Sequence, residues 1–109
     1  MAAKEESDRL VSELRAELAN RQLVVPLQII RTLQRIARES EDMRSSGRVN
    51  DALEVCDVTI DEYEAIYGLE FAPLQGLYFE VEKVYNALGK SAPAAQARKK
   101  ALMLLERMI

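Results

Sequence analysis

Apolar residues recur every three or four positions along most of the chain, which is the spacing of an amphipathic α-helix. No stretch alternates apolar and polar residues as a half-buried strand does. The clearest row lies between Pro73 and Gly89 and consists of Leu74, Leu77, Tyr78, Val81, Val84, Tyr85 and Leu88. Pro73 suits the first turn of a helix, and Gly89 suits the left-handed residue just past its end. The pattern therefore predicts a helix between these two residues.

The same spacing predicts three more helices. The one that follows Pro26 carries Leu27, Ile30, Leu33, Ile36, Ala37 and Met43. The one that ends at Gly68 carries Val49, Ala52, Leu53, Cys56, Ile60, Tyr63 and Tyr67. The last one carries Ala94, Ala97, Ala101, Leu104, Leu105 and Met108. Ser and Asn favour the position before a helix, so we expect Ser91 to cap the last helix. For the helix that ends at Gly68, the expected cap is Asn50, Ser45 or Ser46.

The N-terminal segment, 1–22, carries a thinner apolar row, formed by Leu10, Leu14 and Leu18, on an otherwise charged background. We expect this segment to be a helix that caps the core or pairs across a dimer. At 109 residues the chain is long enough for one core. The predicted fold is therefore all-α, with about five helices in a single domain. Its parts are the N-terminal helix (1–22), a first helical hairpin (26–68) and a second hairpin (72–109).

An internal repeat relates the two predicted hairpins. A shift of the sequence by 42 residues places Gly47 on Gly89 and Ala52 on Ala94. It pairs Ile36 with Tyr78, Met43 with Tyr85, Ile60 with Leu102, Tyr63 with Leu105 and Ile66 with Met108. Self-similarity at a fixed period of this size is typical of stacked helical hairpins. Gly permits a tight turn between two helices, and Ala lets the helices of a hairpin approach closely.

The residues at these positions resemble a known repeat. The second unit has Tyr78 and Tyr85 in its first helix, Gly89 in the turn, and Ala94, Ala101 and Leu102 in its second helix. The first unit reads GRVNDALEVC from Gly47. Together they resemble the tetratricopeptide repeat, in a long form like that of kinesin light chain. The resemblance covers about residues 31–109 and implies antiparallel helical hairpins stacked as a short array.

Three positions depart from the family pattern. Glu39 and Ser40 stand where a large apolar residue and a small residue are usual, and Arg98 stands where an aromatic residue is usual. The period of 42 residues is longer than the usual length of about 34 and closer to the roughly 40–47 residues of HEAT and armadillo repeats. A plain helical bundle is the alternative architecture.

The composition excludes several classes of chemistry. The chain has no His, no Trp and a single Cys, which excludes His-based catalytic triads, metal sites built from His or Cys clusters, and internal disulfides. Cys56 lies on an apolar row beside Asp57, where burial and a carboxylate raise the pKa of a thiol. We therefore expect Cys56 to be a core residue, and we expect no enzyme activity, no cofactor and no bound metal.

The sequence predicts neither a signal peptide nor a membrane span. The first residues, MAAKEESDRL, are charged and lack an apolar core, and no apolar run approaches about 18 residues. One unpaired thiol fits a reducing compartment. We expect a cytoplasmic protein.

Charge is sorted by predicted helix. Residues 49–67 hold six acids and no base, whereas residues 90–109 hold five bases and one acid. Four acids of the first segment share one helix face, namely Glu54, Asp57, Asp61 and Glu64. This face fits a solvated surface, a contact with the chain's own Arg or Lys, or a docking site for a basic partner. The net charge of −3 and the absence of aromatic residues from 90–109 argue against nucleic acid as a partner.

In tetratricopeptide arrays the first helix of each hairpin lines a concave surface that receives peptides or helices. The resemblance implies that the surface is formed here by Gln34, Arg38, Glu41, Arg44, Phe79, Lys83 and Asn86. An aromatic anchor among Arg, Lys and Asn side chains suits an acidic or amphipathic helix. The alternative places Phe79 in the core and the other residues on an ordinary polar surface.

The expected function is that of a non-catalytic protein–protein interaction module, such as an adaptor, a scaffold subunit or a client chaperone. A self-associating structural subunit is the alternative, and a nucleic-acid accessory factor that uses the basic C-terminal helix is a weaker one. Two and a half hairpins leave apolar end faces. We therefore expect a homodimer or a hetero-complex, with Leu10, Leu14 and Leu18 as the self-association seam.

Overall fold

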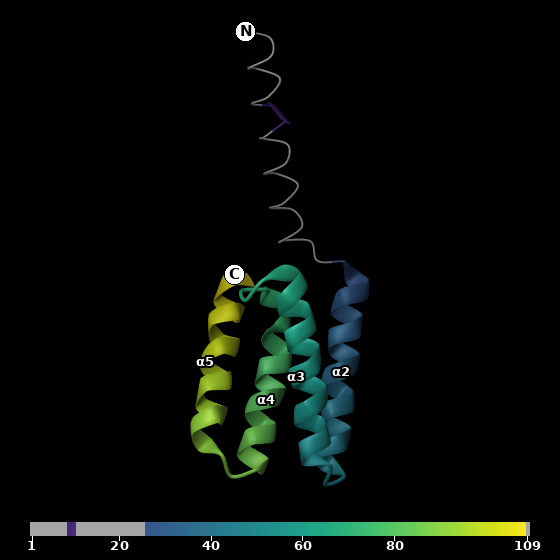
Figure 1. The fold of residues 1–109 in the computed structure, drawn as a ribbon, viewed down its shortest axis with the longest axis vertical. Helices are drawn as coiled ribbons and strands as arrows, with labels where there is room; N and C mark the ends of the chain where they lie inside the picture. Colours follow the sequence, from purple (N-terminus) through teal and green to yellow (C-terminus); the bar gives the residue numbers. More distant parts are fainter. Residues whose placement is uncertain (1–8, 11–25, 109) are drawn as a thin grey trace.

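The computed structural model describes residues 9–10 and 26–108, and residues 26–108 form four α-helices and one short 3₁₀ helix (Figure 1). In chain order these are α2 (Leu27–Ser45), α3 (Val49–Tyr67), η1 (Ala72–Leu74), α4 (Gln75–Ala87) and α5 (Ser91–Met108). No strand occurs in the described residues, so the predicted all-α fold is confirmed. The helix predicted in residues 1–22, with Leu14 and Leu18, lies outside the described residues. Leu10 is described and is 52% exposed.

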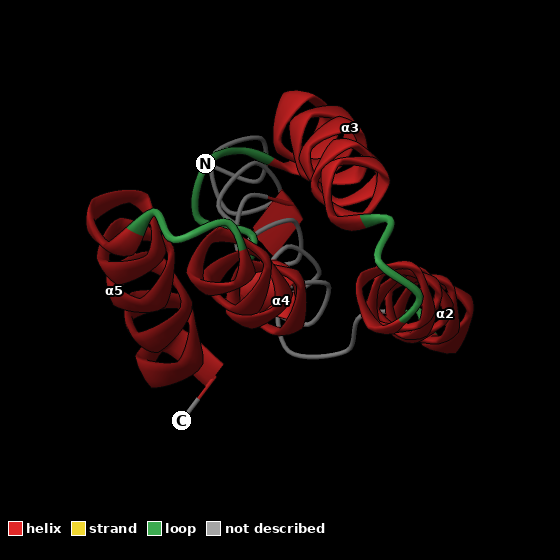
Figure 2. Cartoon of the chain, turned by 90° about the horizontal axis from the view of Figure 1, so that it is seen from below, coloured by secondary structure: helices red, strands yellow, loops and turns green. Residues whose placement is uncertain are grey.

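The helices pack as two pairs, α2 with α3 and α4 with α5, and α4 also packs against both α2 and α3. In Figure 2, which views the chain along its long axis, α4 lies in the middle, with α5 on one side and α2 and α3 on the other. The 3₁₀ helix η1 leads into α4 and also contacts α5 and α2. Each of the other three helices thus depends on α4 for part of its burial.

The two turns within the helix pairs have the same hydrogen-bond pattern at the positions that the repeat relates. In the first turn, the N–H of Arg48 donates to the carbonyl of Met43 (2.7 Å) and the N–H of Gly47 donates to the carbonyl of Arg44 (3.2 Å). In the second, Lys90 donates to Tyr85 (2.9 Å) and Gly89 to Asn86 (3.1 Å). The φ angles of Gly47 and Gly89 are +84° and +72°, a backbone conformation that favours glycine. Both predicted glycine turns are therefore present.

The core lies where the apolar rows of the helices meet. Its buried cluster consists of Leu33, Cys56, Ile60, Leu74, Leu77, Val81, Ala97 and Leu104. Each of these residues belongs to a row predicted from the sequence. Ala52 and Ala94, which the repeat pairs with each other, are also buried. The small side chain at both positions fits the close approach of the two helices in each pair.

Two helix starts differ from the prediction. No described side chain caps α3, and Ser46 instead donates its hydroxyl to the carbonyl of Asp42 (2.8 Å) at the end of α2. The reason is that Ser46 belongs to the turn that satisfies the free carbonyl groups of α2, so it does not reach the amides of α3. The second difference concerns Pro73, which lies in the 3₁₀ helix η1 and not in the first turn of α4.

Two glycines give opposite predictions for the same substitution. Gly89→Ala should lower the free energy of unfolding by about 1 kcal/mol, because Ala is strained at positive φ. Gly76 lies in the first turn of α4, and a Cβ there would meet no atom within 4 Å. Gly76→Ala should therefore raise the free energy of unfolding by about 0.5 kcal/mol, since Ala is the better helix former. Urea unfolding measures both variants, and a change of the same sign in both would contradict the assignment of these backbone conformations.

Candidate functional site

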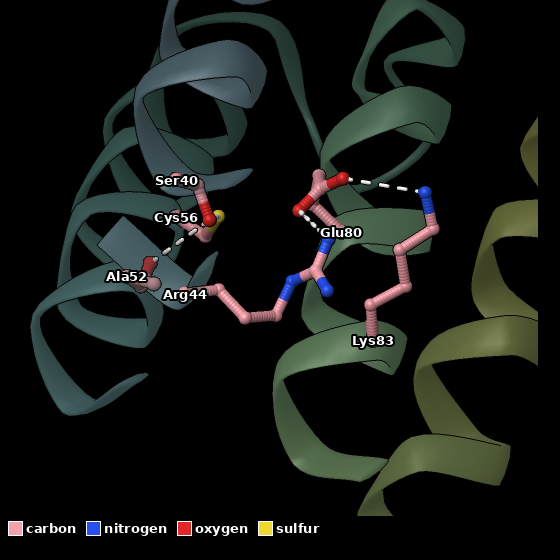
Figure 3. Close-up of polar contacts among 6 residues, drawn as sticks. All are labelled: Ser40, Arg44, Ala52, Cys56, Glu80 and Lys83. Atoms are coloured by element: carbon pink, nitrogen blue, oxygen red, sulfur yellow. Dashed lines mark hydrogen bonds and ion pairs between the residues drawn. The ribbon is translucent and has the colours of Figure 1, made fainter. Parts of the chain in front are cut away.

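A layer of polar side chains crosses the core between α2, α3 and α4 (Figure 3). Its central residue is Glu80 of α4, which is 6% exposed. Leu77 and Val84, three residues before and four residues after Glu80, are buried on the same helix. Glu80 therefore occupies a core-facing position of α4, and its carboxylate lies near the guanidinium of Arg44 from α2.

Two cations approach the Glu80 carboxylate from different helices. The Nη2 atom of Arg44 lies 3.9 Å from Oε2, and the Nζ atom of Lys83 lies 3.4 Å from Oε1. The first distance exceeds that of a hydrogen bond, and both Arg44 Nε and Glu80 Oε2 are buried without a hydrogen-bond partner among the described residues. Removing charges from water is costly unless they are paired and hydrogen-bonded. The pair thus compensates the burial of Glu80 only in part.

A hydroxyl and a thiol continue this layer between α2 and α3. The thiol of Cys56 donates to Oγ of Ser40 (3.3 Å), and the Ser40 hydroxyl donates to the carbonyl of Ala52 (3.5 Å). Burial raises the pKa of the Cys56 thiol, the hydrogen bond with Ser40 lowers it, and the carboxylates of Glu80 and Asp57 raise it further. The neutral thiol is therefore favoured, and Cys56 is a core residue as predicted.

The residues predicted to bind a partner lie on α2 and α4. On α2, Gln34, Arg38 and Glu41 are exposed and follow one another at i, i+4 and i+7, so they share one side of the helix. On α4, Lys83 and Asn86 are exposed. Since α2 packs against α4, the two sets belong to neighbouring helices. We call the surface formed by Gln34, Arg38, Glu41, Phe79, Lys83 and Asn86 the α2–α4 face.

Phe79 and Arg44, the other two predicted binding residues, are each partly buried. Phe79 is half-buried and lies outside the cluster of side chains that forms the core among the described residues. Arg44 is also half-buried and, together with Lys83, is directed towards Glu80 (Figure 3). Arg44 and Lys83 therefore lie near the same carboxylate, that of Glu80, which is not among the residues predicted from the sequence. A signal for Glu80 exists in the sequence, because it interrupts the apolar row of Leu77, Val81 and Val84.

Two of the six acids of α3 have a partner among the described residues. Asp51 pairs with Arg48 (2.9 Å), and Glu64 accepts the hydroxyl hydrogen bond of Tyr78. Burial, and after it the bond to Glu64, raises the pKa of Tyr78. The remaining acids, Glu54, Asp57, Asp61 and Glu62, are exposed and form no ion pair with a described residue. Within the described part of the chain, no group of His, Cys, Asp or Glu side chains has an arrangement that could hold a metal ion.

Three bases of α5 are engaged within the chain. Arg98 pairs with Glu82 (3.7 Å) and Arg107 with Glu70 (2.7 Å). Lys100 donates to the carbonyl of Leu69 (2.6 Å) and lies over the ring of Tyr78, 5.9 Å from its centroid. These contacts tie α5 to α4 and to the segment between α3 and η1.

Comparison with known proteins gives no relative, because no family model, no curated protein and no solved structure matches the chain. Among the helices that the structure describes, none has the length and apolar character needed to cross a membrane.

The layer around Glu80 predicts strong coupling between two substitutions. Arg44→Met should lower the free energy of unfolding by about 1–3 kcal/mol, because it leaves the Glu80 carboxylate buried with only Lys83 nearby. The double variant Arg44→Met/Glu80→Leu should recover most of that loss, because it removes both buried charges. Chemical denaturation of the two single variants and the double variant gives the coupling energy.

Lys83→Met is the control, and it should change stability by less than about 1 kcal/mol because the Lys83 side chain is half exposed to water. Additive effects of Arg44→Met and Glu80→Leu would show that the two side chains do not interact.

Asp57 makes stability depend on pH. Asp57 is exposed, but its partial burial, and after it the neighbouring Asp61 carboxylate, raises the pKa of Asp57 in the folded chain. The folded state therefore binds the carboxyl proton of Asp57 more tightly than the unfolded state does. The free energy of unfolding falls as the pH rises through the range in which Asp57 loses this proton. Asp57→Asn should raise the free energy of unfolding at pH 7 by about 0.5 kcal/mol at most, and the gain should disappear as the pH falls to about 4. Asp51→Asn, which removes the pair with Arg48, should give no such gain.

Proposed function

We propose that this chain is a non-catalytic protein-interaction module whose α2–α4 face binds an acidic or amphipathic helix of a partner protein. The observation that carries the proposal is the position of Phe79. Its ring is half-buried on α4 and lies outside the core cluster of the described residues. An aromatic ring that is fixed on a helix but not used in the core can supply apolar contact at low entropic cost.

The charges around Phe79 support the choice of partner. Lys83 and Asn86 are exposed on the same helix, and Arg38 is exposed on the neighbouring helix α2. Arg38 forms no ion pair with a described residue. Cations beside an apolar anchor favour a helix that combines apolar and acidic side chains, and such charges contribute more to selectivity and association rate than to affinity.

The helix pairs also support a scaffold of repeated hairpins. The turns at Gly47 and Gly89 share one hydrogen-bond pattern, and the first helix of the second pair, α4, packs against both helices of the first pair. This arrangement supports the resemblance to tetratricopeptide hairpins, in which first helices line the binding surface. An adaptor, scaffold subunit or client chaperone in a reducing, cytoplasmic setting is the role that we propose.

The proposal predicts selective binding of an acidic probe. The probe is a fluorescein-labelled amphipathic peptide with Leu on one helical face and Glu on the other, and its control carries Lys in place of Glu. Fluorescence anisotropy should show tighter binding of the acidic peptide. Phe79→Ala should weaken binding by about 2 kcal/mol or more while circular dichroism shows that the fold persists. Arg38→Glu should reduce the preference for the acidic peptide with little change in stability, because Arg38 is exposed and forms no ion pair with a described residue.

Lys99→Glu makes the same charge change on α5, away from the α2–α4 face, and should leave peptide binding unchanged. Unfolding of Phe79→Ala together with unchanged binding by the charge-reversed variant would refute the proposal, because Phe79 would then be a core residue.

A further inference from the structure

The repeat relates a partly covered row of side chains on α3 to an uncovered row on α5. On α3 the row consists of Leu53, Asp57, Ile60 and Glu64, at spacings of four, three and four. α4 packs against α3. Ile60 belongs to the core cluster, Leu53 packs against that cluster, and Glu64 accepts a hydrogen bond from Tyr78 of α4. Leu53, Ile60 and Glu64 therefore contact the core or α4, whereas Asp57 is exposed.

In the 42-residue repeat, the four positions of this α3 row correspond to four positions of α5, which are Ala95, Lys99, Leu102 and Glu106. We call these four residues the α5 row. α5 lies at the edge of the chain in Figure 2, with α4 on one side only. All four residues are exposed, and Leu102 keeps 42% of its surface in water among the described residues. Leu105, beside this row, is 37% exposed.

Two charged side chains of α5, Lys99 and Glu106, have neither an ion pair nor a hydrogen bond with a described residue, and both lie on this row. Arg98, Lys100 and Arg107 have partners on α4 or on the segment between α3 and η1. Lys99 and Glu106 form no ion pair with a described residue. They are separated by seven residues, which is about 10 Å along the helix, and Leu102 lies next to their midpoint.

We propose that the α5 row is a self-association surface, on which α5 of a second copy of this chain packs antiparallel. In this arrangement Leu102 faces Leu102 of the second copy, and Lys99 of each copy lies opposite Glu106 of the other. The two ion pairs are equivalent by two-fold symmetry, as in an isologous dimer. The exposed Ala95 leaves room for the helices to approach closely.

The charges favour a second copy over a different partner helix. A uniformly acidic helix would be repelled by Glu106, and a uniformly basic helix would be repelled by Lys99. An antiparallel copy satisfies both residues at once and buries Leu102 in the same contact. This surface differs from the N-terminal row of Leu10, Leu14 and Leu18, and it is separate from the α2–α4 face that we propose for partner binding.

Charge exchange between two variants tests the proposal. Sedimentation velocity of the full chain over a concentration series gives the dimer dissociation constant. Lys99→Glu and Glu106→Lys should each raise this constant about tenfold or more, because each replaces two attractive pairs with two repulsive ones. An equimolar mixture of the two single variants should restore association, since both pairs are then complementary. The double variant Lys99→Glu/Glu106→Lys should also restore it.

Lys90→Glu is the matched control, because Lys90 is exposed and lies beyond the end of the row. It should leave the dissociation constant unchanged. A chain that stays monomeric at every concentration overturns the proposal. So does an equimolar mixture that associates no better than either single variant.

Cross-linking tests the register independently of charge. Leu102→Cys should form a disulfide-linked dimer on mild oxidation, because the antiparallel arrangement places this position next to the two-fold axis. Ala92→Cys, which is exposed but ten residues away on the same helix, should not. Cys56 is buried and does not compete. Cross-linking of Ala92→Cys without cross-linking of Leu102→Cys would contradict the proposed register.

Discussion

The packing of α4 against all three other helices is the constraint on which the rest of the described structure depends. Leu77, Val81 and Val84 of α4 are buried, and Leu77 and Val81 belong to the core cluster that contains residues of both helix pairs. Burying a side chain of this size contributes about 1.5–3 kcal/mol, and the same contact hides the apolar rows of the neighbouring helices. Neither pair can bury its own row alone, because a pair of helices covers only one side of each member. Each pair therefore requires contact with the other pair to bury its apolar rows.

The central position of α4 also explains its polar residue. A helix that is contacted on three sides has little surface left for water, so Glu80 is buried against α2 although it is charged. Arg44 and Lys83 offset part of the cost of that burial. The side of α4 that remains is the one that carries Phe79, Lys83 and Asn86, which is why our proposal places partner binding there. α5 contacts α4 on one side only, and its outer row is available for a different contact.

The sequence predicted the four described α-helices and both glycine turns, because helical periodicity and positive φ are local properties. The apolar rows also predicted every residue of the core cluster. Three features were not predicted, and the first of them depends on a contact between helices. Glu80 is paired with a residue 36 positions away, Ser46 hydrogen-bonds at the end of α2 and not at the start of α3, and Pro73 lies within a 3₁₀ helix. The partner-binding residues were placed through the family resemblance, and their role stays a prediction.

Native-state hydrogen exchange tests most directly the claim that α4 joins the two pairs into one unit. The account predicts that the slowest amides of α2, α3 and α4 exchange only through global unfolding, with the free energy that urea denaturation gives for the whole chain. Amides near Leu77, Val81 and Val84 should therefore lose protection together with those near Leu33 and Ile60. Persistent protection of α2 and α3 at urea concentrations where α4 has already exchanged would contradict the account.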